Sequence, residues 1–392
     1  MDNRKIRLGI IGMGNMGSGH LSYVLNGECP RVEVTAVADI NPEKLKRACD
    51  RAPGVKGFDE GMKLLDSGLI DAVLIAVPHY DHPRFAIEAF KRGIHVLTEK
   101  PAGVYARQVR EMNEAAEKSG VKFAIMFNQR TNPVYARARE IVSSGQLGEL
   151  KRLVWIVTNW YRTQAYYNSG SWRATWNGEG GGVLLNQAPH NLDLWQWIFG
   201  MPKRVRAFCS VGKYHTIGVE DDVTIYGEYE NGASATFIST TGEAPGTNRL
   251  EISGDLGKIV LEEGKLKWWK LKEPEREICF NCMDGFAQPE CEYSEFRASE
   301  PDGHPLIINN FADAILDGEE LIAPGSEGLN SLSISNAAYL STWNDDWTQI
   351  PVDEEAFEKH LAKLCASEEV IRKNVLKSEP AEKLKERWQV RW

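Results

Sequence analysis

Residues 9–17 read Gly-Ile-Ile-Gly-Met-Gly-Asn-Met-Gly, and this stretch decides the fold of the first third of the chain. An apolar run at residues 6–11 predicts a buried strand before the turn, and residues 16–25 predict an amphipathic helix after it. In that context, the Gly-x-Gly-x-x-Gly spacing allows a tight turn, close approach of a pyrophosphate and close packing of the helix on the strand. We therefore expect a dinucleotide to contact the turn and the positive end of the helix through Gly12, Gly14, Asn15, Met16 and Gly17.

The same alternation continues to about residue 128. Strand-like apolar runs occur at residues 6–11, 32–38, 72–77, 95–98 and 123–127. Amphipathic segments separate them at residues 16–25, 43–51, 83–92 and 106–118. Continuous apolar strands that alternate with helices predict a parallel sheet covered on both faces. The expected fold class is α/β, with an N-terminal Rossmann domain whose parallel sheet is doubly wound.

Asp39 ends the second predicted strand, 22 residues after Gly17. An acid about 20 residues after the glycines bonds the ribose 2′-hydroxyl in folds of this kind. A carboxylate at that place repels a 2′-phosphate, so the position favours NAD over NADP as the cofactor. The alternative interpretation is a cap for the helix that starts near Pro42.

The pattern changes after residue 128. Helices are expected at residues 133–143, 187–199, 306–316 and 328–343, and a long strand at residues 150–160. Successive strands with short turns between residues 204 and 269 predict an α+β domain with an open, mostly antiparallel sheet. Residues 273–305 are polar and are expected to form a long loop. The predicted domains are 1–128 for the cofactor, 129–352 for substrate and oligomer contacts, and 353–392 as a charged helical tail.

Composition excludes several classes of protein. The 392-residue chain is 42% hydrophobic and 26% charged, with a net charge of −9. The acidic balance argues against binding to nucleic acid or to an anionic membrane surface, and no apolar run reaches the about 18 residues that a membrane helix needs. Seven scattered cysteines and a start without a signal-peptide pattern predict a cytoplasmic location with free thiols.

A zinc site is one alternative use of these thiols. Cys279 and Cys282 form a close pair, with Cys291 and His304 further along the chain. A structural zinc site usually needs a second close pair of ligands, and this chain offers none. The sequence therefore predicts no metal.

Lys100 lies in Glu99-Lys100-Pro101 at the end of the fourth predicted strand. Ligands of open α/β sheets bind beyond the carboxyl ends of the strands, which places Lys100 near a nicotinamide. A partly desolvated lysine beside a positive charge has a lowered pKa and can exchange a proton with a reacting hydroxyl. A solvated surface lysine is the alternative.

Asn186 and His190 stand four residues apart in the stretch GGGVLLNQAPHNLD and share one face of a helical turn. Imidazole suits removal of a hydroxyl proton because its pKa lies near neutrality, whereas a core histidine bonded to the backbone is the alternative. Aromatic rings and arginines upstream offer faces for a sugar ring or ordinary packing. They are Trp155, Trp160, Tyr161, Arg162, Tyr166, Tyr167, Trp172, Arg173 and Trp176.

Together these motifs resemble the Gfo/Idh/MocA family of NAD(P)-dependent oxidoreductases, over nearly the whole chain. The resemblance rests on GIIGMGNMG, AVADINPEKL, AVPHYDHPRFAIEAFKRGIHVLTEKPAG, FNQRTNP and GGGVLLNQAPHNLDLWQWIFG. It implies a catalytic lysine at Lys100 and a catalytic histidine at His190. The family usually has Asp four positions before that histidine, where this chain has Asn186, so we expect a less stabilised Lys100 ammonium.

The resemblance also implies contacts and an activity. Cofactor contacts are expected from Pro78, His79, Glu99 and Lys100, and substrate contacts from Gln129, Arg130, Tyr161, Trp172, Arg173, Asn186 and His190. The expected reaction is hydride transfer between NAD and a ring secondary hydroxyl, best matched by C3 of a glucoside, which gives a 3-keto sugar. Alternatives are an inositol dehydrogenase, an NAD-dependent redox-neutral glycosidase and a non-catalytic NAD-binding sensor. A homodimer or homotetramer is expected.

Overall fold

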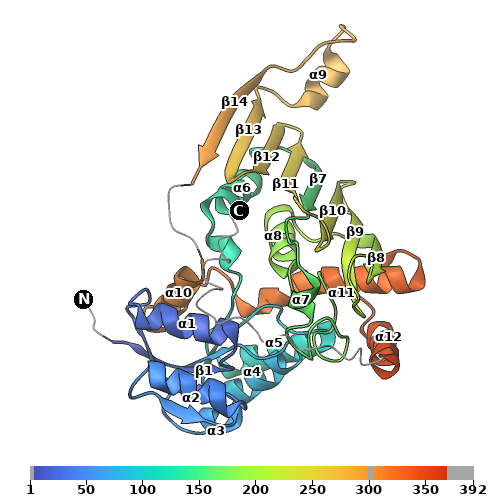
Figure 1. Cartoon of the computed structure of the whole chain (residues 1–392). Coiled ribbons are helices and arrows are strands. Elements are labelled where there is room, and N and C mark those ends of the chain that lie inside the picture. The colour runs from blue at the N-terminus through green and yellow to red at the C-terminus, as the bar shows by residue number, and fades with distance from the viewer. Residues whose placement is uncertain (1–3, 299–302, 369–392) are drawn as a thin grey trace.

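The computed structural model describes residues 4–298 and 303–368, which form two sheets with their covering helices (Figure 1). The first sheet is parallel, with strand order β3-β2-β1-β4-β5-β6. Its strands are β1 Ile6–Ile11, β2 Val32–Ala38, β3 Lys56–Phe58, β4 Ala72–Ile75, β5 His95–Thr98 and β6 Phe123–Ile125. Its helices are α1 Asn15–Leu25, α2 Pro42–Arg51, α3 Gly61–Leu65, α4 Asp81–Lys91 and α5 Ala106–Ser119. The predicted doubly wound parallel sheet is confirmed.

The centre of this sheet is its topological switch point. Strand β1 lies between β2 and β4. The chain adds β2 and β3 on one side of β1, then crosses over and adds β4, β5 and β6 on the other side. Ligands of such sheets bind beyond the carboxyl ends of the strands at this place. The glycine turn follows β1, Asp39 follows β2, Pro78 follows β4 and Lys100 follows β5. The topology therefore gathers the predicted cofactor residues at one edge.

Two elements of this region were not predicted from the sequence. Strand β3 has 3 residues with Gly57 in its centre, and helix α3 has 5 residues. Segments of that length are too short to show a hydrophobic period. By contrast, every residue of β4 is buried, which explains its continuous apolar run.

The second sheet has the strand order β14-β13-β12-β11-β7-β10-β9-β8-β15. Within the described ranges its neighbours pair antiparallel, except that β7 and β10 are parallel. The strands are β7 Leu150–Val157, β8 Arg204–Val211, β9 Glu220–Glu228, β10 Ser234–Thr240, β11 Asn248–Gly254, β12 Gly257–Glu262, β13 Lys265–Leu271, β14 Cys291–Arg297 and β15 Thr348–Gln349. The predicted mostly antiparallel sheet is confirmed.

The helices that follow β6 are η1 Asn128–Thr131, α6 Pro133–Ser143, α7 Gln164–Tyr167, α8 Pro189–Phe199, α9 Glu275–Asn281, α10 His304–Leu316, η2 Gly325–Glu327, α11 Gly328–Asn344 and α12 Glu354–Ser367. Of these, α8 packs against α6 and α11, and all three pack against the second sheet. The fully buried Trp155 and Phe237 of the sheet lie 6.2 Å apart between ring centroids, and Trp195 of α8 stacks on Phe237 at 5.9 Å. This packing fixes α8, which carries His190, on the sheet.

The expectation of a long loop at residues 273–305 is wrong. Helix α9 begins at Glu275, and β14 extends the sheet edge next to β13 (Figure 1). The polar composition suggested a loop because β14 is an edge strand whose residues are largely exposed. Such a strand shows no alternation of apolar and polar residues. Its pairing partner is β13, to which it binds over seven register pairs from Lys265 to Leu271.

The last described helices return to the first sheet. Helix α10 lies beside α1 and helix α11 beside α5 (Figure 1). A β-bridge between Ala124 and Pro324 joins the strand β6 to the segment before η2. Helices α10 and α11, which come late in the chain, contact helices of the first sheet. The domain limits at residues 128 and 352 therefore remain a prediction. Of the expected tail at residues 353–392, α12 is helical and residues 369–392 lie outside the described residues.

All seven cysteines lie in the described part of the chain and have free thiols. Cys279, Cys282 and Cys291 are exposed, and within residues 4–298 and 303–368 no three His, Cys, Asp or Glu side chains gather as metal ligands would. In the same ranges, no helix has both the length and the apolar character that crossing a bilayer requires.

Candidate active site

The glycine turn leaves space for a phosphate at the start of α1. Gly12 has φ +94°, and a Cβ at Gly17 would clash with the carbonyl of Gly12, so both positions need glycine. A Cβ at Gly14 would meet nothing within 4 Å, so the turn is open on that side. No side chain caps α1, and its first turn, with Asn15 and Met16, contains no acid. Backbone N–H groups of this helix end therefore suit a pyrophosphate.

Asp39 is not the cap of α2. The cap is Asn41, whose side chain accepts the N–H groups of Glu43 and Lys44. The Asp39 carboxylate accepts the Met13 N–H at 2.7 Å and the Asn41 N–H at 2.7 Å. Asp39 therefore fixes the glycine turn and remains partly exposed beside it, where a ribose would bind.

Glu99 joins the end of β5 to α1. Its Oε1 lies 2.6 Å from His20 Nε2, and both residues are buried. Burial alone would raise the pKa of Glu99, but the hydrogen bond and charge of His20 outweigh it and lower the pKa to about 2. Glu99 is therefore a carboxylate at neutral pH, directly before Lys100.

Lys100 reaches from the first sheet to the second domain. Its Nζ donates to the main-chain oxygen of Asn186 at 2.8 Å. Burial lowers the pKa of Lys100, the charges of Glu99 and Glu179 oppose that shift, and Arg173 adds to it. The structure thus brings together the predicted lysine and the stretch that carries Asn186 and His190.

His190 lies in the first turn of α8 and is 9% exposed. Burial lowers its pKa well below 6.5, and the charge of Lys100 lowers it further, so the two side chains act on one another. Its ring stands edge-on to Phe127 at 6.3 Å, and Nδ1 finds no hydrogen-bond partner among the described residues. The imidazole is therefore neutral and able to accept a proton.

This shift predicts where activity is lost in acid. A base with a lowered pKa stays neutral until the pH falls through that lowered value, so the acid limb of kcat/KM for alcohol oxidation is expected below pH 6.5. The measurement is kcat/KM from about pH 5 to about pH 9, with unfolding monitored at each pH. A limb centred above pH 6.5 would contradict the assignment, and His190→Asn should remove the limb together with most of the rate.

Asn186 is held by three side chains. Its Oδ1 accepts from Tyr166 Oη at 3.3 Å and from Gln187 Nε2 at 3.2 Å, and its Nδ2 donates to Glu179. Glu179 is 2% exposed and was missed by the sequence reasoning. The available signal was an acid directly before three glycines, close in sequence to the Asn that replaces an expected Asp.

Close packing brings the Gly180–Gly181–Gly182 segment onto the lysine loop. A Cβ at Gly180 would clash with Val104, four residues after Lys100, and one at Gly182 would clash with the Glu220 carbonyl. The Glu220 carboxylate also accepts the Gly182 N–H at 2.9 Å. The glycines are therefore needed for Glu179 and Asn186 to approach Lys100.

Aromatic and cationic side chains flank this group. The Arg173 guanidinium lies 4.6 Å from the Trp172 ring centroid and 4.7 Å from that of Tyr166, and it donates to Tyr166 Oη at 2.9 Å. The Trp172 ring lies 5.9 Å from His79, whose Nδ1 is 2.9 Å from the main-chain oxygen of Glu179. Predicted cofactor and substrate residues thus meet here.

Three other predicted residues have different surroundings. Pro78 is exposed after β4, and Tyr161 is 49% exposed. Gln129 is buried, and its Oε1 finds no partner among the described residues, so it is free to meet a ligand.

Arg130 does not join the group. Its side chain is 1% exposed and pairs with Asp193 and Glu327 at 2.6 Å each. It also donates to the Ile322 carbonyl at 3.2 Å. The guanidinium belongs to an ion pair with Asp193 that joins η1 to α8, and the predicted substrate contact of Arg130 stays a prediction.

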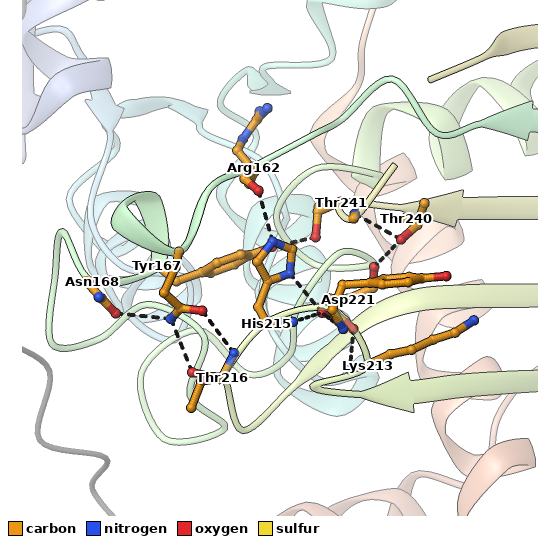
Figure 2. A network of polar contacts seen from close by, with 12 residues as sticks. Arg162, Tyr167, Asn168, Lys213, His215, Thr216, Asp221, Thr240 and Thr241 are labelled. Atoms are coloured by element: carbon orange, nitrogen blue, oxygen red, sulfur yellow. Dashed lines mark hydrogen bonds and ion pairs between the residues drawn. The ribbon is translucent and has the colours of Figure 1, made fainter. Parts of the chain in front are cut away.

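Figure 2 shows how the segment that carries Tyr166 is held. His215 bonds Asp221 Oδ2 at 2.8 Å through Nδ1 and the Arg162 carbonyl at 2.9 Å through Nε2. Tyr167 Oη lies 2.7 Å from Thr241 Oγ1. These bonds tie residues 162–168 to β9 and to Thr241, which follows β10, and so place the Tyr166 ring beside Arg173.

Comparison with known proteins decides the family. A model of an oxidoreductase family with an NAD-binding Rossmann fold, Gfo/Idh/MocA, matches residues 6–127. A model of the Gfo/Idh/MocA C-terminal domain matches residues 135–260, and together the two span more than half of the chain. The chain belongs to the Gfo/Idh/MocA family. It is an oxidoreductase that uses NAD, and the glycine turn and Asp39 fit that cofactor.

Relatives within the Gfo/Idh/MocA family act on sugars and inositol. Levoglucosan dehydrogenase of Pseudarthrobacter phenanthrenivorans is 25% identical, with 89% of this chain and 99% of that protein covered. Inositol 2-dehydrogenase of Corynebacterium glutamicum is 24% identical, with 90% and 97% covered. Rhizopine catabolism protein MocA of Rhizobium meliloti is 30% identical over 196 residues, where the match spans 50% of this chain and 58% of MocA.

A solved Gfo/Idh/MocA-like structure supports the same architecture. The WlbA dehydrogenase of Bordetella pertussis, crystallised with NADH and UDP-GlcNAcA, has a TM-score of 0.74 and 28% identity. The match covers 89% of this chain and 100% of that one. The two-sheet arrangement is therefore shared with a protein that binds NADH.

The pKa of Lys100 is lowered from its ordinary value, chiefly by burial, so the expectation of a less stabilised ammonium beside Asn186 stays a prediction. Asn186 carries no charge, but the carboxylates of Glu99 and Glu179 both raise the pKa of Lys100 against the effect of burial. Negative charge therefore reaches Lys100 from other positions of the chain.

Proposed function

We propose that this oxidoreductase transfers hydride between NAD and a ring secondary hydroxyl of a sugar or glycoside, with C3 of a glucoside as the preferred position and a 3-keto sugar as the product. The observation that carries the proposal is the convergence of Lys100, Asn186 and the neutral His190 beyond the carboxyl ends of the first sheet. A polyol such as inositol presents the same edge of secondary hydroxyls and is the second candidate, supported by the inositol 2-dehydrogenase relatives.

The residues divide the work of oxidation. His190 accepts the hydroxyl proton, because its imidazole is neutral at physiological pH. The Lys100 ammonium donates to the same oxygen and stabilises the negative charge that develops on it. Asn186 orients the hydroxyl. Bound NAD supplies the hydride acceptor at its nicotinamide, so a secondary alcohol loses a proton and a hydride and becomes a ketone.

The rings around Arg173 support a sugar ring as the substrate. Trp172 and Tyr166 offer flat apolar faces for ring C–H groups, and Arg173 and Gln129 offer polar groups for hydroxyls. We place the cofactor at Gly12, Gly14, Asn15, Met16, Gly17, Asp39, Pro78, His79 and Glu99. We also propose a cytoplasmic homodimer or homotetramer with a small-molecule substrate and no nucleic-acid or membrane partner.

A substrate panel tests the proposal. Glucosides, free sugars and inositols are incubated with NAD or NADP, NADH formation is followed by absorbance, and products are identified by mass spectrometry. Deuterium at C3 of the glucoside should appear in NADH if C3 is the position oxidised. Oxidation of inositol alone would select the second candidate. Release of free sugar without net NADH would identify a redox-neutral glycosidase, and no turnover of any member would favour a sensor.

Removing the charge of Asp39 should relax the choice of cofactor. Asp39→Asn keeps an oxygen for the Met13 N–H but no longer repels a 2′-phosphate, so the ratio of kcat/KM for NADP to that for NAD is expected to rise about tenfold or more. Asp39→Ala also loses the bond to Met13 and should weaken both cofactors. An unchanged ratio in Asp39→Asn would show that Asp39 serves only the turn.

A further inference from the structure

We propose that Glu179 is a positioning residue that holds the Asn186 side chain and places a negative charge near Lys100, which favours the ammonium form of Lys100 for reaction. The proposal rests on the function proposed above and adds a residue to it. Its basis is a continuous chain of contacts: Lys100 Nζ donates to Asn186 O at 2.8 Å, and Asn186 Nδ2 donates to Glu179 Oε1.

Glu179 is buried among groups that favour its ionised form. Its side chain is 3% exposed, and a buried carboxylate persists only where partners satisfy it. Oε2 accepts the Ala174 N–H at 2.6 Å, while Oε1 accepts from Asn186 and lies 3.7 Å from the Arg173 guanidinium. Burial has the largest effect and raises the pKa of Glu179 above its ordinary value, whereas Arg173, the Ala174 N–H, Asn186 and Lys100 each oppose that shift.

The pair of residues at positions 179 and 186 is chemically matched. An Asp at position 186 would place two carboxylates against one another, which like charges disfavour. Asn186 instead donates its amide hydrogen to Glu179 and still offers Oδ1 to Tyr166 and Gln187. One carboxylate is thus kept beside Lys100, at a different position of the chain.

Other charged and titratable groups also act on Lys100, and each must stay unchanged in a test. They are Glu99 in the loop after β5, Arg162 and Arg173 in the segment of residues 162–173, His79 in the loop after β4, His190 in α8 and His304 in α10. Substitution at position 179 leaves all of these in place.

The test compares Glu179→Gln with the double variant Glu179→Gln/Asn186→Asp. In the single variant Lys100 loses a nearby negative charge, so the alkaline limb of kcat/KM should move to lower pH by about one unit and kcat should fall about 10- to 100-fold. In the double variant, the carboxylate introduced at position 186 can accept from the amide introduced at position 179 and from Tyr166 and Gln187, so the limb and most of kcat should return. Glu354→Gln removes a carboxylate that pairs with Arg110 on the surface and should move neither.

A second measurement needs no turnover. The cofactor-free protein is labelled at a series of pH values with an acylating reagent that reacts with neutral amines, and mass spectrometry follows the Lys100 peptide. The labelling midpoint should shift to lower pH in Glu179→Gln and return in the double variant. A shifted midpoint in a protein that oxidises no ring alcohol would overturn the function but keep the Glu179 assignment. A folded Glu179→Gln protein with an unshifted midpoint would overturn the assignment.

Discussion

Lys100→Met should lower kcat/KM for the preferred ring alcohol by about 10²- to 10⁴-fold and leave NADH affinity within about threefold of the wild type. Methionine keeps the length of the side chain and removes the ammonium that bonds the Asn186 carbonyl. The developing negative charge on the substrate oxygen then lacks its nearest donor. NADH affinity should survive because the glycine turn and Asp39, which fit the cofactor, do not depend on this ammonium.

Two measurements separate these effects. Steady-state rates at saturating NAD give kcat/KM, and quenching of protein fluorescence by NADH gives the dissociation constant. Lys63→Met is the matched control, because Lys63 pairs with Asp59 and Glu60 on the surface of α3. A Lys100→Met enzyme with more than about a third of wild-type kcat/KM would show that Lys100 is not in the reaction.

The first domain was predictable because each signal is local. Strands at residues 32–38 and 95–98 have the predicted bounds, since residues 36–38 and 96–98 are buried and turns bound both segments. Backbone conformation requires glycine at position 12, and close packing requires it at position 17. The glycines themselves indicate these requirements in the sequence. The convergence of Lys100 with the stretch around Asn186 was also expected, although it joins the two domains.

What escaped prediction depends on contacts between distant segments. The partner of Asn186 is fixed by the approach of the glycine segment to Val104, and no pattern in the sequence records that distance. Strand β14 is exposed, so its place is set by pairing with β13 and not by apolar alternation. Arg130 follows Gln129 in a motif that resembles a substrate site, and no local pattern reveals its buried pair with Asp193.

Arg130→Met should therefore destabilise the fold by about 3–5 kcal/mol, the usual cost of breaking a buried pair by removing one partner. The Asp193 side chain is 1% exposed and would be left with Gln196 Nε2 as its remaining side-chain donor. Glu327 is 37% exposed, so water can solvate it after the change. Urea unfolding of the protein without cofactor measures the loss.

The double variant Arg130→Met/Asp193→Leu shows whether the loss comes from the stranded charge. Replacing both members of a buried pair by apolar side chains is often close to neutral, so most of the stability should return. Activity is the second readout. Asp193 lies three residues after His190 on α8, so disorder of Asp193 would also move the His190 imidazole. Unchanged stability in Arg130→Met together with a raised KM for the substrate would restore Arg130 to the substrate contacts. If the Arg130 guanidinium serves to hold η1 against α8, the single variant should lose stability and the double variant should recover it. In both variants KM should then stay near the wild-type value.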